Sequence, residues 1–251
     1  MTCPAEEEDP FPADDGLFSE TFSQEVVYTL MSEQLKITQV FGANLGVAAP
    51  VWEAVRARSG HLIKWIRLTF CFIFLTPDIC AQAVHLCRYL EDQSVNLKGK
   101  RIIELGAGTG LVGILAARLG AEVTLTDLPL ALPQLQANVS ANTPSGGWPS
   151  AEPAVLPLSW GEDHLDFPSD WDLVLGADII YLPETYPLLV KTLAHLCKDG
   201  AVVYLSSKIR KEHEAHVFFE QYLPSRFHVI LVHRDEKQNN NIYRACLRTE
   251  E

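Results

Sequence analysis

The chain has 251 residues, of which 47% are apolar and 21% charged, a balance typical of a globular protein that can bury a substantial core. Its net charge is −12, but the first 24 residues hold seven of the 32 acidic residues and none of the 20 lysines and arginines. The remainder is only mildly acidic, which excludes the basic surface that proteins use to grip phosphate backbones, so nucleic acid is not expected as a partner.

The cysteines and the apolar stretches exclude several other classes. The six cysteines are scattered, with neither a CxxC pair nor the spacing of a zinc site, so no metal is expected and a reduced, intracellular protein is indicated. The acidic N-terminus lacks the basic and apolar regions of a signal peptide. The most apolar stretch, residues 68–75, is too short to span a bilayer, so no membrane span is expected.

The chain is predicted to hold an acidic tail followed by one domain. Residues 1–24 combine acids with three prolines and have little to bury, which predicts disorder. Residues 25–251 form the predicted domain. Its first part, residues 25–40, is rich in Val, Tyr, Leu, Ile and Thr with partial alternation, which predicts a pair of strands. Residues 44–54 follow with a helix-entry pattern that includes a proline.

From residue 99 onwards, strands and helices are predicted to alternate. Short apolar runs indicate strands at residues 101–105, 122–126, 155–159, 171–177, 201–206, 227–233 and 242–247. Helical patterns lie at residues 111–119, 130–142, 184–197 and 214–222. Repeated strand–helix–strand units predict a parallel sheet covered by helices on both faces. No helix separates the last two strands, so one of them is expected to run antiparallel.

A glycine-rich loop, Glu-Leu-Gly-Ala-Gly-Thr-Gly at residues 104–110, follows the first regular strand and opens a helix. Ligands of open α/β sheets bind at this edge. The next strand ends in Asp127, whose carboxylate can accept hydrogen bonds from both hydroxyls of a ribose. The spacing is GxGxG preceded by Glu104, not the GxGxxG that seats a pyrophosphate, which favours S-adenosylmethionine over a dinucleotide. Two alternatives stay open: a tight turn without a ligand, and a nicotinamide-dependent oxidoreductase.

A second acidic motif, Asp178-Ile-Ile-Tyr181, follows the strand at residues 171–177 and faces the same edge as Asp127. Methyl transfer needs a nucleophile aligned behind the methyl group, and an amine must lose a proton before it can attack. Asp178 is suited to hold an incoming ammonium, and Tyr181 to wall the methyl channel. The alternative is that Asp178 caps the following turn while Tyr181 packs in the core.

Five stretches together resemble the methyltransferase-like twenty-one group of protein-lysine methyltransferases. They lie at residues 38–52, 104–113, 126–130, 158–161 and 175–181, and the resemblance extends over residues 16–54 and 83–251. It implies an α/β fold, the Rossmann-like seven-stranded sheet of S-adenosylmethionine-dependent methyltransferases with a short N-terminal β extension. The implied cofactor-binding residues are Trp52, Gly106, Ala107, Gly108, Asp127, Trp160 and Ala177, to which we add Glu104.

The resemblance also implies the acceptor and the partners. The Asp178-Ile-Ile-Tyr181 run matches the family's acidic–x–x–tyrosine motif beside the substrate lysine, so Asp178 and Tyr181 are the candidate catalytic residues. Within the group, the residues are most similar to members that methylate translation elongation factor 1-alpha, which makes this factor the expected substrate. A cytoplasmic location, contacts with chaperones and a monomeric state are expected as well. The charged stretch at residues 208–214 is either a contact for the protein substrate or a solvated helix start.

Residues 55–82 have no counterpart in the resemblance. The segment carries four bases, one acid and an aromatic run, and it interrupts a predicted helix three residues after Trp52. Three interpretations stay open: a translated intron or misassigned exon, a tolerated surface loop, and a basic, aromatic interaction segment. If the segment removes the support of Trp52, cofactor affinity falls, and the chain is then a binding protein without turnover.

Overall fold

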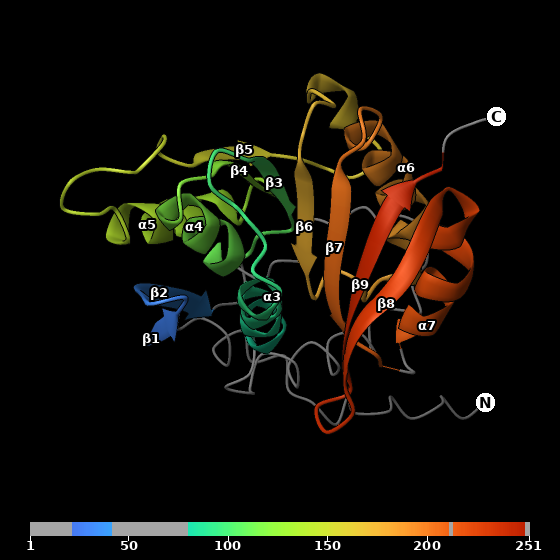
Figure 1. Ribbon diagram of the computed structural model, residues 1–251, viewed down its shortest axis with the longest axis horizontal. Coiled ribbons are helices and arrows are strands. Elements are labelled where there is room, and N and C mark those ends of the chain that lie inside the picture. Colours follow the sequence, from blue (N-terminus) through green and yellow to red (C-terminus); the bar gives the residue numbers. More distant parts are fainter. Residues whose placement is uncertain (1–21, 42–79, 211–212, 249–251) are drawn as a thin grey trace, which may run out of the picture.

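The computed structural model describes residues 22–41, 80–210 and 213–248. At its centre lies a seven-stranded sheet with the order β5-β4-β3-β6-β7-β9-β8 (Figure 1). The strands are β3 (Arg101–Leu105), β4 (Glu122–Asp127), β5 (Ala154–Pro157), β6 (Leu173–Ala177), β7 (Val202–Lys208), β8 (Phe227–Asp235) and β9 (Asn240–Leu247). Neighbouring strands are parallel except that β9 runs antiparallel to β7 and β8. The predicted parallel sheet with one reversed strand is therefore confirmed.

Helices cover both faces of this sheet. One apolar core contains the buried faces of α3 (Ala81–Asp92), α4 (Leu111–Arg118) and α5 (Leu132–Ala141). The other contains α6 (Tyr186–Leu196) and the segment from α7 (Ala215–Val217) to a π-helical turn at Phe218–Tyr222. Side chains of the strands alternate between the two: Ile102 of β3 packs in the first core and Ile103 in the second.

One predicted helix differs from the structure. Residues 214–222 form the three-residue α7 followed by the π-helical turn instead of a continuous α-helix. Two consecutive rings, Phe218 and Phe219, are both buried there: Phe218 packs edge-on against Tyr186, and Phe219 stacks on Tyr243 at 3.7 Å between centroids. The two rings are thus buried against different partners within a π-helical turn, where the sequence pattern predicted an α-helix.

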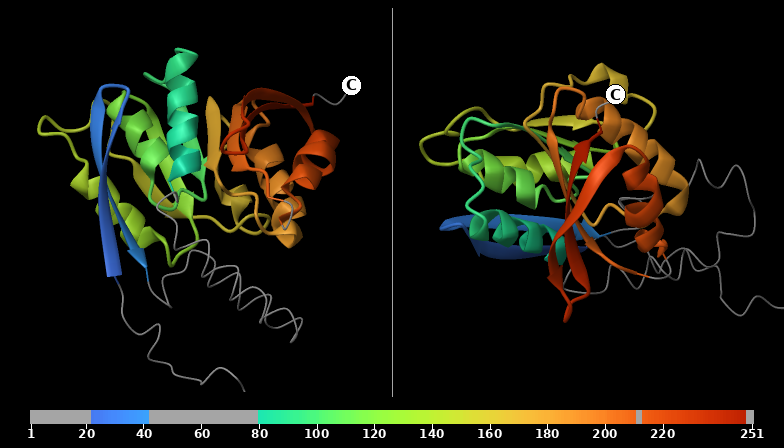
Figure 2. Two further views of the ribbon diagram at one scale, coloured as in Figure 1. Left: turned by 90° about the horizontal axis from the view of Figure 1, so that it is seen from below. Right: turned by 45° about the vertical axis from the view of Figure 1, so that its right-hand side comes forward.

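The predicted strand pair is a β-hairpin of its own. β1 (Phe22–Leu30) and β2 (Glu33–Phe41) pair antiparallel around Met31 and Ser32, both with positive φ, as the tight two-residue hairpin turn requires. The first three residues of β1, 22–24, belong to the stretch predicted as the acidic tail. The hairpin lies beside the helices of the first core (blue in Figure 2, left).

The hairpin docks on α5 through a row of amide side chains. Three amide side chains, two in α5 and one at its C-cap, are spaced four residues apart and thus lie on one helix face; they bond to backbone groups of alternate residues of β2. The pairs are Gln134 with Val40, Asn138 with Thr38, and Asn142 with Lys36, at 2.8–2.9 Å. The amides thereby satisfy the edge of β2 that β1 does not pair. Asn138 also donates to the carbonyl of Thr109, so the same row reaches the glycine loop.

Two sequence expectations concern membranes and cysteines. Among the helices of the described ranges, none combines the length and apolar character that a membrane span requires. Four cysteines fall in these ranges, and all four are free thiols: Cys80, Cys87, Cys197 and Cys246.

Candidate functional site

The glycine loop connects the carboxyl end of β3 to the start of α4. Gly106, Gly108 and Gly110 all have positive φ, between 56° and 81°, a region that L side chains rarely adopt. A Cβ at Gly106 would lie 2.8 Å from Ile179, and one at Gly110 would lie 2.5 Å from Leu135. At Gly108 the same position has no atom within 4 Å, so the backbone there is open to a ligand.

Asp127 lies where the sequence places it, at the last residue of β4 beside this loop. Its carboxylate accepts hydrogen bonds from the backbone N–H of Gly108 and of Leu128, both at 2.7 Å. The side chain is buried, and burial raises the pKa of Asp127 to about 6 despite these two hydrogen bonds. A carboxylate offers about four acceptor sites, so two remain for other donors such as ribose hydroxyls.

Glu104 contacts the helix after the loop. Its Oε2 atom accepts a hydrogen bond of 2.8 Å from the backbone N–H of Gly113, in the first turn of α4. The N-cap position of α4 is Gly110, which has no side chain to cap the helix, and Glu104 supplies that acceptor from β3. Burial raises the pKa of Glu104 to about 8. In the structure, the Glu104 carboxylate thus binds a backbone group of the protein itself.

Glu104→Gln should flatten the dependence of stability on pH. The folded chain holds the Glu104 proton up to about pH 8, whereas the unfolded chain releases it near 4.5, so stability falls as pH rises through that window. The raised pKa of Asp127 also makes stability fall as pH rises, but only up to about pH 6. Melting temperatures between pH 6.5 and 8.5 should therefore fall in the wild type and change less in the variant. Glu152→Gln, at an exposed carboxylate, is the matched control, and equal slopes in all three proteins would contradict the assignment.

Trp160 lies beside the loop, in the segment after β5. A Cβ at Gly106 would lie 3.5 Å from its Cζ2 atom, and the indole is only partly buried. The next residue, Gly161, has a φ of 80°, and its N–H donates to the hydroxyl of Thr192 on α6 at 2.8 Å. The segment that carries the indole is thus anchored on α6, which packs on the other face of the sheet from α4.

Ala177 and Asp178 lie at the carboxyl end of β6. Ala177 is its last residue, and the N–H of Asp178 donates to the carbonyl of Ser206 on β7 at 2.8 Å. Asp178 has a φ of 56°, unusual for a residue other than glycine and common at functional sites. This conformation turns the chain sharply away from the sheet directly after the strand.

Arg210 is a site residue that the sequence analysis did not single out. Its guanidinium forms an ion pair with Asp178 through both carboxylate oxygens, with Nη1–Oδ1 at 2.9 Å and Nη2–Oδ2 at 3.2 Å. Arg210 follows β7 and belongs to the charged stretch at residues 208–214. In the sequence, only this charged stretch draws attention to Arg210. A charged stretch does not indicate that its partner is Asp178, 32 residues away.

Tyr181 interacts electrostatically with two acids of the site, Asp127 and Asp178. Its side chain is largely buried, and burial together with the carboxylates of Asp127 and Asp178 raises the pKa of Tyr181. The phenol therefore stays neutral and lies near the ends of both β4 and β6. The structure brings together Gly106, Ala107, Gly108, Asp127, Trp160, Ala177, Asp178 and Tyr181 at one edge of the sheet. Trp52 lies outside the described residues.

The described part of the unmatched segment is short. Residues 55–79 lie outside the described ranges, while Ala81 and Gln82 already belong to α3. Cys80, just before this helix, lies with its sulfur 3.5 Å from the hydroxyl of Thr109 in the glycine loop. The chain that follows the segment therefore reaches the candidate site directly.

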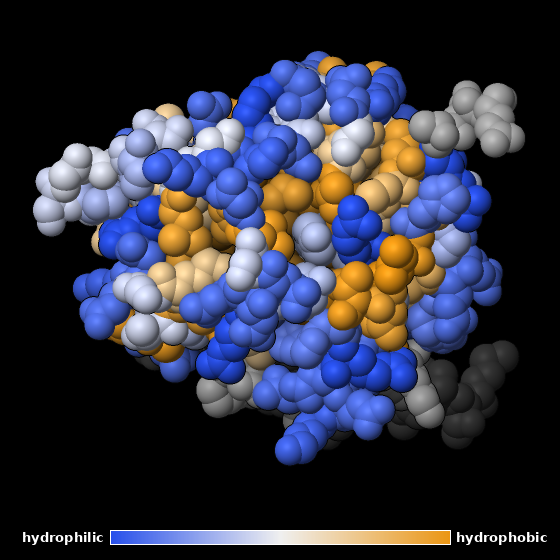
Figure 3. All heavy atoms as spheres, in the orientation of Figure 1, coloured by the Kyte–Doolittle hydropathy of each residue, from blue (hydrophilic) through white to orange (hydrophobic). Residues whose placement is uncertain are grey.

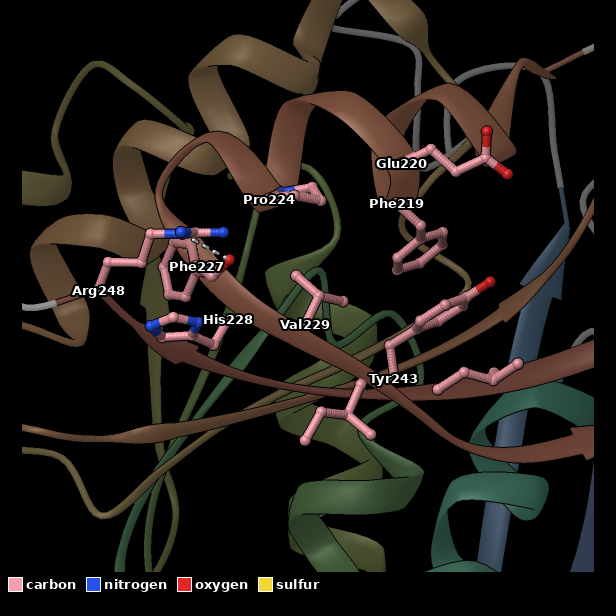
Figure 4. A pocket seen from close by; sticks show the side chains of 10 residues that line it. Phe219, Glu220, Pro224, Phe227, His228, Val229, Tyr243 and Arg248 are labelled. Atoms are coloured by element: carbon pink, nitrogen blue, oxygen red, sulfur yellow. Dashed lines mark hydrogen bonds between the residues drawn. The ribbon is translucent and has the colours of Figure 1, made fainter.

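A separate hollow lies between β8, β9 and the π-helical turn (Figure 4). It encloses about 570 Å³ and is lined by residues that include Phe219, Val229 and Tyr243. The neighbouring edge strand β8 exposes Ile230 and Leu231, and apolar residues gather on the face of the molecule over these strands (Figure 3). None of the residues predicted for the cofactor or the acceptor lines this hollow, so it is distinct from the candidate site.

Comparisons with known proteins identify the family of the chain. The family model described as lysine methyltransferase matches residues 29–223. The chain is 47% identical over 240 residues to the EEF1A lysine methyltransferase 3 of Mus musculus, covering 96% of this chain and 90% of that protein. It is 43% identical over 219 residues to the protein N-lysine methyltransferase METTL21A of Danio rerio, covering 87% of this chain and 85% of that protein.

The solved structures confirm the fold. The 16S rRNA N2 G1207 methyltransferase RsmC of T. thermophilus, in complex with AdoMet and guanosine, superposes with a TM-score of 0.56 at 17% identity, covering 90% of this chain and 51% of that one. The magnesium protoporphyrin IX methyltransferase ChlM of Synechocystis, with bound SAH, has a TM-score of 0.50 at 15% identity, covering 79% and 100%. The predicted seven-stranded methyltransferase sheet and its cofactor, S-adenosylmethionine, are confirmed. By its sequence, the chain belongs to the lysine methyltransferase family.

Proposed function

We propose that this chain methylates a lysine of translation elongation factor 1-alpha. The observation that carries the proposal is the pair of Asp178 and Tyr181 at the carboxyl end of β6, on the same sheet edge as the glycine loop and Asp127. The mouse relative, named EEF1A lysine methyltransferase 3, supports the choice of substrate. A cytoplasmic location belongs to the same proposal.

Different residues at the loop would bind different parts of the cofactor. Gly106, Ala107 and Gly108 would hold its amino-acid moiety by close backbone approach, Asp127 would accept from the ribose hydroxyls, and Trp160 would cover the adenine. The open Cβ position at Gly108 and the two unused acceptor sites of Asp127 fit such a ligand. S-adenosylmethionine supplies a methyl group on a sulfonium, so the protein needs no phosphate site.

Asp178 and Tyr181 act on the acceptor. The Asp178 carboxylate holds and orients the lysine side chain, and the neutral, largely buried Tyr181 walls the channel and excludes water. The lysine ammonium gives one proton to solvent at the exposed side of Asp178. S-adenosylmethionine would supply the methyl group, its bond to sulfur breaking, and the neutral nitrogen that Asp178 orients would accept it.

The transfer assay follows directly from this proposal. Incubation of the chain with methyl-labelled cofactor and purified elongation factor should place label on a lysine of the factor, located by mass spectrometry. Asp178→Ala should lower the labelling rate at least about tenfold, because the lysine is no longer oriented behind the methyl group.

Two controls separate the alternatives. Asp166→Ala removes an exposed carboxylate outside the site and should leave the rate unchanged. A factor that binds the chain but stays unlabelled would refute turnover and favour a methyltransferase-fold binding protein. Label on a different protein of an extract, with none on the factor, would keep the lysine chemistry and refute the substrate.

A further inference from the structure

The ion pair between Arg210 and Asp178 places a positive charge beside the carboxylate that the proposed function assigns to the substrate lysine. Both side chains are largely enclosed, with exposures of 18% for Arg210 and 24% for Asp178. The guanidinium takes one acceptor site on each carboxylate oxygen, which leaves about two of the four sites. The exposed part of the carboxylate therefore still has room for one further donor.

Arg210 is held in this position from the sheet. Directly before it, the N–H of Ile209 donates to the carbonyl of Asn239, and the side-chain amide of Asn239 donates back to the carbonyl of Ile209. On the other side, the backbone of Asp178 is bonded to Ser206 of β7. The backbone beside Arg210 is thus held by the turn between β8 and β9, and that of Asp178 by β7, so the two-pronged contact is fixed by the fold.

We propose that Arg210 is a positioning residue of the transfer reaction, which compensates the charge of Asp178 so that the bound lysine is deprotonated more readily. The inference rests on the proposed function. An uncompensated carboxylate would stabilise the lysine in its ammonium form, and an ammonium has no lone pair for attack. With Arg210 in place, Asp178 can orient the nitrogen while its own negative charge is compensated.

Two other titratable groups of the site, Tyr181 and Asp127, do not supply this compensation. Tyr181, from the loop after β6, is neutral because its pKa is raised. Asp127, at the end of β4, acts on the same phenol and adds negative charge to the site. The site therefore holds two acids, and Arg210 is the base that contacts one of them directly.

The pH dependence of the single-turnover rate tests this role. In Arg210→Gln the ascending limb of the rate should move about one pH unit upwards, which lowers the rate near neutral pH about tenfold. Arg210→Lys keeps the charge and should keep the limb at the wild-type pH, at a lower rate because the two-pronged contact is lost. The substrate is purified elongation factor with labelled cofactor.

Controls distinguish this inference from a structural role. Arg101→Gln removes a guanidinium at the opposite, amino end of the sheet, where it pairs with Asp170, and should not move the limb. Thermal melting and cofactor binding report whether each variant is folded, and Arg210→Met replaces the glutamine variant if that one does not fold. An unmoved limb in the uncharged variant, or an equal shift in Arg210→Lys, would overturn the inference. The proposed function fails separately, if the wild type transfers no label.

Discussion

Replacing Asp127 by alanine should weaken the binding of S-adenosylmethionine about a hundredfold or more. Two hydrogen bonds from ribose hydroxyls to an ionised carboxylate contribute about 1.5–3 kcal/mol each, and the variant loses both. It also loses the acceptor that holds the N–H of Gly108 at 2.7 Å, so the loop becomes less ordered before the ligand arrives. Titration calorimetry at pH 7.5 measures the change.

The affinity of the wild type for S-adenosylmethionine should itself depend on pH. Because the pKa of Asp127 is raised to about 6, wild-type affinity should fall as pH decreases from 7.5 to 5.5, when the carboxylate takes up a proton and loses acceptor capacity. Asp170→Ala, at an exposed acid on the amino side of the sheet, should bind like the wild type. Unchanged affinity in Asp127→Ala would remove this residue from the cofactor site.

Asn138→Ala should lower the free energy of unfolding by about 3 kcal/mol and the melting temperature by about 6–12 °C. The side chain makes three hydrogen bonds of 2.9 Å: it exchanges two with the backbone of Thr38 and donates one to the carbonyl of Thr109. Asn138 is buried, so truncation leaves these backbone groups without partners and without full access to water.

The control lies on the same helix. Gln136→Ala, on the exposed side of α5, should change stability by less than about 0.5 kcal/mol. Because Asn138 joins the hairpin to the glycine loop, its variant should also bind S-adenosylmethionine more weakly, whereas the Gln136 variant should not. Equal melting temperatures for the two variants would mean that the amide row does not hold the hairpin.

The regular part of the fold was predictable because its signals are local. β3 occupies the residues that its apolar run predicted, and the β-hairpin was correctly expected near residues 25–40. The glycine loop and Asp127 follow from the same logic: positive φ and the end of a buried strand are properties of a few consecutive residues. Where two neighbouring rings had to be buried on different partners, as at Phe218 and Phe219, the local pattern failed.

The sequence by itself determined the sheet, the glycine loop and the acids at the strand ends. Only the tertiary structure decided what these acids contact: Glu104 caps α4, and Asp178 pairs with Arg210. It also showed that Asn138 holds a strand 100 residues away. The physical reason is that periodicity and turn chemistry act between near neighbours, whereas parallel strands meet through long crossovers that bring distant residues to one edge. The sequence pattern therefore predicts which residues lie at the edge of the sheet, and the packing of the crossovers determines which side chains contact one another there.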